Sequence, residues 1–514
     1  MPTVSPPAPD HGRRRALLGD ALIASTAGLA LGLAFPRFDW DALAWVALAP
    51  LFVTAVTRRP RAAFGWGWLA GLVFFAFLLR WLNFTFSVYS SIPWPLTLGP
   101  TLALAGYCAL YFGLVAAAMS WVSARRSPTW ALAAAPFFWV AAEWVRGHLM
   151  EGFPWGSLGY SQYLRLTVIQ VAELGGIHAV SFLIALVNAT VAGLVVLPWR
   201  RAAAALVVAV AVVTGCLLFG MARLGVPARA GEVRIAVMQP SIEQPLKWDD
   251  KQISTTLAIY MALTRRAAHE HPDLLVWPET ASPTILTRDE GLLNTLTYVA
   301  DTTGMPLLVG SVDGDDARGY RNTAFLVTGK GIAGRYDKMH LVPFGEYVPL
   351  SGVIGFVKSW AEFISELEPG SAPVVFPGPP APFGAVICYE GIFPDLYRKF
   401  VKSGARLMIN MTNDAWFGRT SGPAQHLAMY PLRAVEHRTA VVRAANTGIS
   451  AFIAPSGRIV RWMRLFERGT MIESLPLRSG ETLYTRVGDW VAWLSFAVAA
   501  AALGAAATAR RRPA

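Results

Sequence analysis

Long apolar runs separated by short polar connections make up the first 220 residues of the chain. Seven such runs are present, and an eighth lies close to the C-terminus: 16–35, 41–57, 63–82, 98–122, 129–145, 172–197, 202–220 and 489–509. About 20 apolar residues in a helix span the hydrocarbon core of a bilayer. The pattern therefore predicts a polytopic α-helical membrane domain of eight transmembrane helices.

The pattern changes at Glu232 to short β-branched runs between polar segments. Runs of strand length occur at 233–238, 274–277, 306–309, 323–327, 385–388, 407–410, 440–443 and 449–452. Intervening segments such as 252–270 suit amphipathic helices. Strands that alternate with helices predict an α/β domain, with sheets inside and helices packed outside.

Composition agrees with a membrane protein. Of the 514 residues, 54% are hydrophobic and only 15% are charged, and the mean hydropathy is +0.42. The net charge of +12 could indicate a nucleic-acid partner, but neither a basic face nor a stacking motif accompanies it, so we expect none.

Arginine clusters in the connections predict the topology. They fall on one side of the spans: 13–15, 58–61, 125–126, 200–201 and 510–512. By the positive-inside rule this side is cytoplasmic. The polar segment 224–486 follows the seventh run, so we expect it outside the cytoplasm.

Four parts are expected along the chain. They are a disordered cytoplasmic leader (1–15), a seven-helix transmembrane domain (16–223), an extracytoplasmic α/β domain (224–486), and a last transmembrane helix with a basic cytoplasmic tail (487–514). The basic cluster before residue 16 is also typical of a signal peptide. Further apolar runs follow at once, which favours a membrane span.

Cys388 ends the strand-like run 384–387 and is followed by Glu390 and Gly391. A thiol at the exit of a buried strand is well placed to act as a nucleophile, because the strand fixes its position and the turn keeps it accessible. A small core residue is the equally plausible alternative. Cys108 and Cys216 lie in apolar runs, so Cys388 is expected to be a free thiol.

Two other strand ends offer groups that a thiol nucleophile needs. Glu279 follows the run 274–277, and Lys338 follows the short extended run 334–337. A glutamate can take the thiol proton, and a lysine can favour the thiolate and stabilise an oxyanion. Taken singly, a glutamate such as Glu279 is more often a helix N-cap or a surface acid, and a lysine such as Lys338 is more often a solvated charge.

Together these residues resemble a known triad. Glu279 in WPET, Lys338 in YDKMHLVPFGEYVP and Cys388 in ICYEGIFPD are similar to the Glu-Lys-Cys triad of the nitrilase, or carbon-nitrogen hydrolase, superfamily. More narrowly, the chain resembles the apolipoprotein N-acyltransferase family over nearly its whole length, including QPLKWD (244–249) and TNDAWFG (412–418). The resemblance implies a nitrilase-like α-β-β-α sandwich at 224–486.

The resemblance also implies a two-step acyl transfer at the periplasmic face of a bacterial inner membrane. Cys388 would take the sn-1 acyl chain of a phospholipid, for which phosphatidylethanolamine is expected, as a thioester. The α-amine of the diacylglyceryl cysteine of an apolipoprotein would then receive it. Glu279 would be the general base, and Lys338 would hold the oxyanion.

Further roles are expected around this triad. Glu346 and Glu390 resemble supporting acids, with a structural salt bridge as the alternative, and Trp248, Tyr389 and Trp416 are candidates to line the substrate path. The segment 347–369 carries an apolar set at helical spacing, typical of a core helix or of a lid that admits lipid.

Two other functions are compatible with part of this pattern. A membrane-anchored amidase would use the same triad and end with water, but it would need at most one anchor. A lipid-binding protein with an inactive domain is disfavoured by the complete triad. We expect a monomer with no cofactor. We also expect no metal site, because His269 and His271 lack zinc-site spacing and partners.

Overall fold

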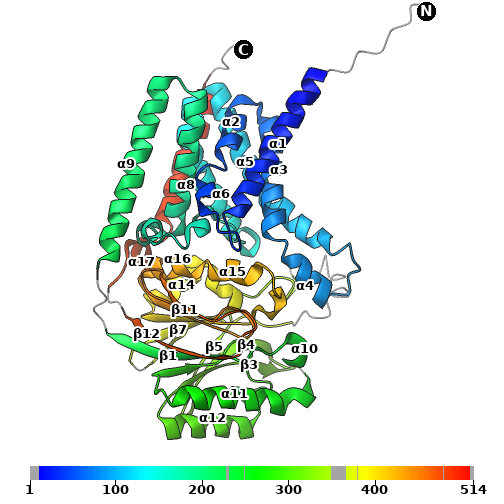
Figure 1. The fold of residues 1–514 in the computed structure, drawn as a ribbon, viewed down its shortest axis with the longest axis vertical. Helices are drawn as coiled ribbons and strands as arrows, with labels where there is room; N and C mark the ends of the chain where they lie inside the picture. Colours follow the sequence, from blue (N-terminus) through cyan, green and yellow to red (C-terminus); the bar gives the residue numbers. More distant parts are fainter. Residues whose placement is uncertain are drawn as a thin grey trace, which may run out of the picture.

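The structure is a computed structural model that describes residues 11–226, 231–247, 249–348, 366–378, 380–477 and 480–509. A helical part fills one end, and an α/β part fills the other (Figure 1). The last helix returns to the helical part, where it packs against the helices of the first half of the chain.

The helical part is built from residues 11–226 and the last helix. Its α-helices are α1 (His11–Leu33), α2 (Ala49–Thr57), α3 (Pro60–Leu78), α4 (Leu82–Tyr89), α5 (Leu98–Arg125), α6 (Pro128–His148), α7 (Leu166–Ile169), α8 (Ala172–Val196), α9 (Trp199–Leu224) and α18 (Trp490–Thr508). Its 3-10 helices are η1 (Asp41–Trp45), η2 (Leu149–Glu151) and η3 (Leu158–Gln162). Helix α1 begins five residues before the expected end of the leader, whose first ten residues lie outside the described chain.

Within the described residues, six helices are long and apolar enough to cross a bilayer: α1, α3, α5, α8, α9 and α18. The expected count of eight is therefore not confirmed. The run 41–57 is broken between η1 and the nine-residue α2. The run 129–145 forms the 21-residue α6, in which Glu143 and Arg146 lower the mean hydropathy.

Small residues let α3 and α5 cross closely. A Cβ atom on Gly67 would lie 2.7 Å from the Phe112 carbonyl oxygen, and one on Gly71 would lie 2.8 Å from the Ala109 Cα. Such spacing of small residues is typical of helix pairs in membranes, where packing rather than the hydrophobic effect brings helices together.

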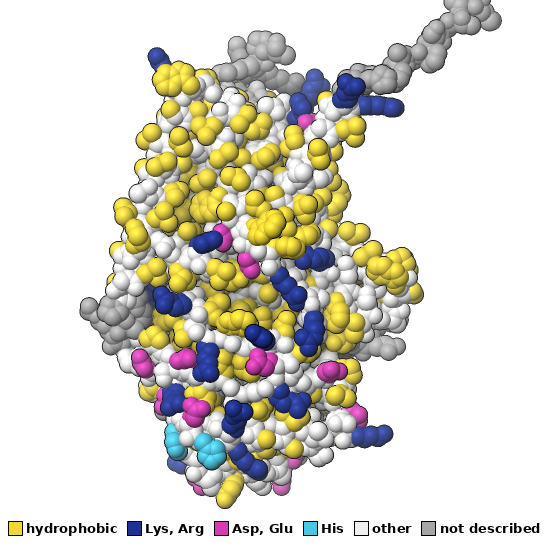
Figure 2. All heavy atoms as spheres, viewed as in Figure 1, with side chains coloured by type: hydrophobic (Ala, Val, Ile, Leu, Met, Phe, Trp, Pro, Cys, Tyr) yellow, Lys and Arg dark blue, Asp and Glu magenta, His cyan; other side chains and the backbone are white. Residues whose placement is uncertain are grey.

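The surface of the helical part is apolar. Figure 2 shows apolar side chains over the helices, while the charged side chains gather on the α/β part and at the far end of the helices. Helix α9 exposes a row of large apolar side chains that includes Leu206, Val207, Val208, Val210 and Leu218. An exposed apolar surface of this extent is expected where lipid replaces water.

The α/β part contains two six-stranded sheets. The first has the order β12-β1-β2-β3-β4-β5, and the second has the order β11-β10-β9-β8-β7-β6. The strands are β1 (Glu232–Gln239), β2 (Leu274–Val276), β3 (Leu307–Asp315), β4 (Gly319–Thr328), β5 (Gly331–Asp337), β6 (Val375–Phe376), β7 (Phe383–Ile387), β8 (Leu407–Thr412), β9 (Ala440–Ala445), β10 (Ala451–Ile453), β11 (Ile459–Trp462) and β12 (Gly469–Pro476).

Helices cover both outer faces of the paired sheets (Figure 1). The described α-helices of the α/β part are α10 (Gln244–Lys247), α11 (Ile253–Ala268), α12 (Glu290–Thr303), α14 (Pro394–Lys402), α15 (Gly422–Leu427), α16 (Tyr430–His437) and α17 (Leu483–Val487), and its 3-10 helices are η4 (Asp250–Gln252), η6 (Cys388–Ile392) and η7 (Asp414–Phe417). Helices α11 and α12 pack on the first sheet, and α14 and α16 pack on the second. The layers are therefore α-β-β-α, as the sequence predicts.

Strand β1 shows how the sequence produces these layers. Side chains alternate across a strand. Val233, Ile235 and Val237 belong to the core that includes the second sheet, while Ala236 and Met238 belong to the core beneath α11 and α12. From Ile235 to Met238 both faces are buried, so this part of the strand is apolar and packs on two sides.

The two parts of the molecule are joined by buried polar contacts. Gln425 of α15 accepts hydrogen bonds from the indoles of Trp81 (3.2 Å) and Trp155 (2.8 Å). Its amide nitrogen donates to the carbonyls of Pro36 and Leu78, both at 3.1 Å. One side chain therefore satisfies four groups of the helical part.

Candidate active site

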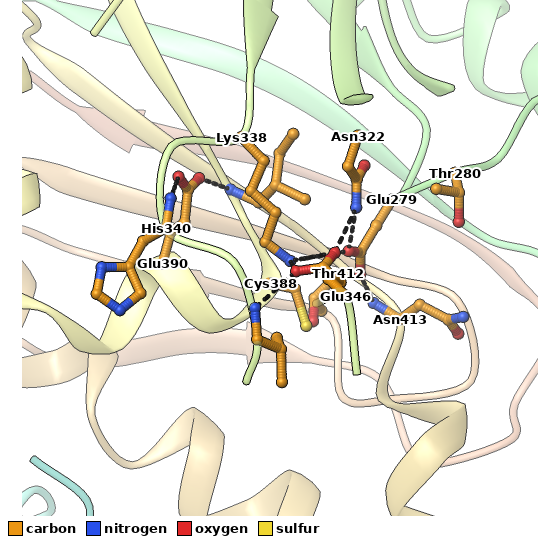
Figure 3. A network of polar contacts seen from close by, with 12 residues as sticks. Glu279, Thr280, Asn322, Lys338, His340, Glu346, Cys388, Glu390, Thr412 and Asn413 are labelled. Carbon is orange, nitrogen blue, oxygen red and sulfur yellow. Dashed lines mark hydrogen bonds and ion pairs between the residues drawn. The ribbon is translucent and has the colours of Figure 1, made fainter. Parts of the chain in front are cut away.

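Three strand ends meet where the two sheets face each other. Glu279 follows β2, Lys338 follows β5 and Cys388 follows β7. The parallel strands β1, β2 and β3 of one sheet and β7, β8 and β9 of the other deliver their carboxyl ends to this region. Figure 3 shows the three side chains pointing toward one another. The sequence prediction that they lie together is therefore matched by the fold.

Cys388 occupies an unusual backbone conformation. Its φ is +52°, a left-handed value that is uncommon outside glycine. The Cys388 carbonyl accepts hydrogen bonds from the Asn410 side chain (3.1 Å) and from the Tyr430 hydroxyl (3.3 Å). These contacts hold the sharp turn that lifts the thiol out of the strand.

The Glu390 carboxylate accepts hydrogen bonds that stabilise the same turn. It is fully buried and accepts hydrogen bonds from the backbone of Ile387 (2.7 Å) and Met339 (2.6 Å) and from the Tyr336 hydroxyl (2.7 Å). Burial raises the pKa of Glu390 to about 7, and these donors act in the opposite direction. Glu390 thus ties the cysteine turn to the segment that carries Lys338.

Lys338 is 1% exposed and lies between two carboxylates. Its Nζ is 2.8 Å from Glu346 Oε2 and 3.5 Å from Glu279 Oε1. Burial lowers the pKa of Lys338, but the charges of Glu346 and Glu279 outweigh burial, so the pKa lies well above its ordinary value. Lys338 is therefore a fixed positive charge at neutral pH.

Glu279 is held by donors on both oxygens. Asn322 Nδ2 donates to Oε1 and the Asn413 backbone N–H donates to Oε2, each at 2.8 Å. The Lys247 ammonium donates to the Glu279 carbonyl at 3.0 Å. Burial lowers the pKa of Lys247 to about 8, against the opposing charge of Glu279. The Glu279 carboxylate is thus oriented rather than mobile.

The Cys388 thiol lies near the negative charge of Glu279 and the positive charge of Lys338. Burial raises the pKa of Cys388, the charge of Glu279 raises it further, and Lys338 counteracts this only in part. The thiol is therefore protonated at neutral pH. An attack by sulfur at this position requires a base that takes the proton during the reaction.

Two family models match this chain, one over the helical part and one over the α/β part. The model of the apolipoprotein N-acyltransferase N-terminal domain matches residues 27–190, and that of carbon-nitrogen hydrolase matches residues 234–483. The chain is 38% identical to an apolipoprotein N-acyltransferase of Geobacter metallireducens over 506 residues, which are 96% of each chain. The chain belongs to the apolipoprotein N-acyltransferase family.

Two further proteins are similar to this chain to different degrees. The apolipoprotein N-acyltransferase of Gloeobacter violaceus is 35% identical over 501 residues, covering 95% of this chain and 94% of its own. Among solved structures, an amidase from Nesterenkonia sp. is 20% identical and covers 52% of this chain and 98% of its own, with a TM-score of 0.39.

The other candidate residues from the sequence differ in how they contact Glu279, Lys338 and Cys388. Glu346 contacts Lys338 directly, as expected. Tyr389 is next to Cys388 and donates a hydrogen bond to the Gly152 carbonyl at 3.4 Å, so it joins the cysteine turn to the helical part. The Trp416 ring packs on Tyr89 of α4 with ring centroids 4.9 Å apart.

Some expectations fall outside the described residues. Trp248 is one of them, and 349–365 is another, so the choice between a core helix and a lid for the segment 347–369 stays open.

Sequence reasoning missed the groups that orient the acid. Asn413 lies in the quoted segment 412–418 and Lys247 lies in 244–249, so the motifs contained both residues without indicating their roles. Asn322 lies within β4 and donates to both Glu279 and Glu346. Nothing in its local sequence sets it apart, because its role depends on strand pairing between distant segments.

Proposed function

We propose that this chain transfers the sn-1 acyl chain of a phospholipid to the N-terminal diacylglyceryl cysteine of apolipoproteins, with Glu279, Lys338 and Cys388 as its catalytic triad. The observation that carries the proposal is the convergence of a protonated thiol, an oriented carboxylate and a fixed cation in a member of this family. Phosphatidylethanolamine is the proposed donor.

In the first step, Glu279 takes the S–H proton as the sulfur of Cys388 attacks the ester carbonyl carbon. The carbonyl oxygen becomes an oxyanion, which Lys338 and a backbone N–H beside Cys388 stabilise. The carbon–oxygen bond then breaks. Glu279 returns the proton to the leaving oxygen, so the lysophospholipid departs as an alcohol and the acyl chain stays on Cys388 as a thioester.

In the second step, the α-amine of the lipidated cysteine attacks the thioester. Glu279 takes a proton from the amine and passes it to the sulfur as the carbon–sulfur bond breaks. The products are an amide and the free thiol, so the enzyme returns to its starting state. A water-poor site favours this outcome, because a thioester reacts more readily with an amine than with water.

Both proposed substrates are lipids, which accounts for the large helical part. A hydrolase of small amides would need at most one anchor, whereas a phospholipid donor and a lipidated acceptor must both arrive from the bilayer. We place the chain in the bacterial inner membrane with the α/β part on the periplasmic face, as the arginine pattern indicates. We also propose that α6 and the segment 41–57 complete eight spans.

The proposal is tested by mass spectrometry of the purified protein after incubation with phosphatidylethanolamine. The native chain should carry a fatty-acyl mass on the Cys388 peptide that hydroxylamine removes, and Cys388→Ala and Glu279→Gln should lack it. Release of ammonia from simple amides without an acyl adduct would contradict the proposal and favour the amidase.

A further inference from the structure

A second polar cluster lies away from the active site, where the two parts of the molecule meet. His148 ends α6, Asp395 lies in the first turn of α14, and Asp489 caps the start of α18. His148 Nε2 is 2.9 Å from Asp395 Oδ2 and 3.9 Å from Asp489 Oδ2. All three ligand atoms lie within 4.8 Å of one another, close enough to share one ion.

The hydrogen bonds of His148 determine which ring nitrogen is free. Its Nδ1 lies 2.7 Å from the Trp144 carbonyl, which can only accept, so Nδ1 carries the proton. In the neutral ring, Nε2 then presents a lone pair to two carboxylates. Lone pairs facing one another at these distances repel, so a cation belongs between them: a proton on Nε2, or a metal ion.

Asp489 is oriented for the same role. Its Oδ2 accepts from the Trp144 indole at 2.8 Å, and its Oδ1 accepts from the Tyr484 hydroxyl at 3.0 Å. The carboxylate is 8% exposed. Partners of this kind fix metal-binding carboxylates and imidazoles in many proteins, since they set the orientation of each ligand.

The imidazole of His178 lies in the wall of the cavity beside this cluster. His178 of α8 is 6% exposed, and its Nδ1 has no hydrogen-bond partner among the described residues. His178, His148 and Asp395 line the same cavity of about 450 Å³. A second imidazole group therefore lies in the wall of the cavity beside the three ligands.

We propose that His148 Nε2 and the carboxylates of Asp395 and Asp489 bind a divalent transition-metal ion of the zinc class. One imidazole and two carboxylates are a nitrogen and oxygen donor set that suits Zn²⁺ and Co²⁺, and the cavity leaves room for water at the remaining positions. The ion links α6, α14 and α18, so it fastens the α/β part to two helices of the helical part.

Metal titration of the full-length protein in detergent tests the site. The parent for all proteins is Cys388→Ala with any affinity tag removed, so that neither the reactive thiol nor a tag competes for metal. After treatment with chelator, Co²⁺ is added and its visible absorption is followed. We expect one Co²⁺ per chain, displaced by Zn²⁺.

Asp395→Asn is the decisive variant, because the Asp395 side chain is 47% exposed and its amide keeps the shape of the carboxylate. It should weaken Co²⁺ binding at least tenfold. His269→Gln is the matched control, since His269 is exposed at the end of α11, and it should bind as the parent does. No saturable binding in the parent, or equal binding by both variants, would overturn the proposal and leave a protonated His148 paired with Asp395.

Discussion

At the residue scale, burial and two opposite charges act on the Cys388 thiol. Burial raises the pKa of the thiol, the Glu279 carboxylate raises it further, and the Lys338 ammonium lowers it. The same carboxylate that disfavours the thiolate at rest can accept its proton during attack. In the proposed mechanism, Glu279 would therefore suppress unproductive thiolate chemistry and still serve as a base.

This balance predicts the pH dependence of Cys388 alkylation. Replacing Glu279 by Gln removes a neighbouring negative charge, so the pKa of Cys388 should fall and the alkylation midpoint should move to lower pH. The rate of iodoacetamide labelling against pH, followed on the Cys388 peptide, measures it.

The matched control for this shift is Glu270→Gln, which alters a carboxylate that is 58% exposed and paired with Arg234 rather than with the active-site groups. It should leave the profile unchanged. A midpoint in Glu279→Gln that stays unchanged or rises would show that the charge of Glu279 does not raise the pKa of the thiol.

The proximity of Glu279, Lys338 and Cys388 could be predicted from the sequence because each residue stands at a strand end within a motif. The role of Glu390 could not be predicted in full. The resemblance implies a supporting acid that orients Lys338 and Glu279 or the incoming amine, whereas Glu390 accepts hydrogen bonds from the backbone of Ile387 and Met339. The packing of two turns determines which backbone N–H groups bond to this buried acid. A local sequence pattern does not predict such packing.

At the element scale, the position of Glu279 depends on how closely β2 approaches β3. A Cβ atom on Gly310 would lie 2.3 Å from the Pro278 carbonyl oxygen and 2.9 Å from Glu279 Cα. These neighbours are backbone atoms that cannot rotate away. Gly310 therefore allows the strand end that carries the acid to lie against β3.

Gly310→Ala should displace that strand end. We expect a loss of about 1–3 kcal/mol in the free energy of unfolding and slower acyl-enzyme formation, by up to about 100-fold, because small misplacements of a catalytic group are costly. Thermal unfolding and the rate of thioester formation measure the two effects.

Gly291→Ala serves as the control, since Gly291 lies in α12 and a Cβ there would lie 3.5 Å from Asp289 Oδ1, an ordinary contact. It should be neutral or stabilising. Native thioester formation by Gly310→Ala would contradict this account of how the acid is placed.

The strands themselves were largely predictable, because buried strands are apolar on both faces. All eight predicted runs overlap described strands, and the extended run before Lys338 belongs to β5. Three described strands were missed. Strand β6 has two residues, β11 is mostly exposed and β12 pairs only at the edge of its sheet, so none shows a strong apolar run.

At the scale of the whole molecule, the helical part and the α/β part are joined by polar contacts as well as by packing. Gln425 satisfies two indoles and two carbonyls across this boundary. Tyr389, the neighbour of Cys388, reaches the Gly152 carbonyl. The active site is thus built against the helical part, as expected for substrates that arrive from a bilayer.

The number of spans was the least predictable feature at this scale. Hydropathy locates apolar runs, but it does not show whether a run is one helix. The run 41–57 divides into η1 and α2, and α6 combines a long helix with the buried residues Glu143 and Arg146. Polar groups inside such a bundle follow from packing between helices, which a single run does not reveal.

The most direct measurement of the central claim is a single-turnover transfer. Acyl-enzyme formed from phosphatidylethanolamine is freed of excess lipid and mixed with a diacylglyceryl-cysteine peptide or with buffer alone. We predict that the acyl chain leaves Cys388 rapidly to give the N-acylated peptide, and that it stays bound in buffer. An N-acetylated peptide should leave the thioester intact. Equal loss of the acyl chain with and without the peptide, as free fatty acid, would contradict the account and identify a hydrolase.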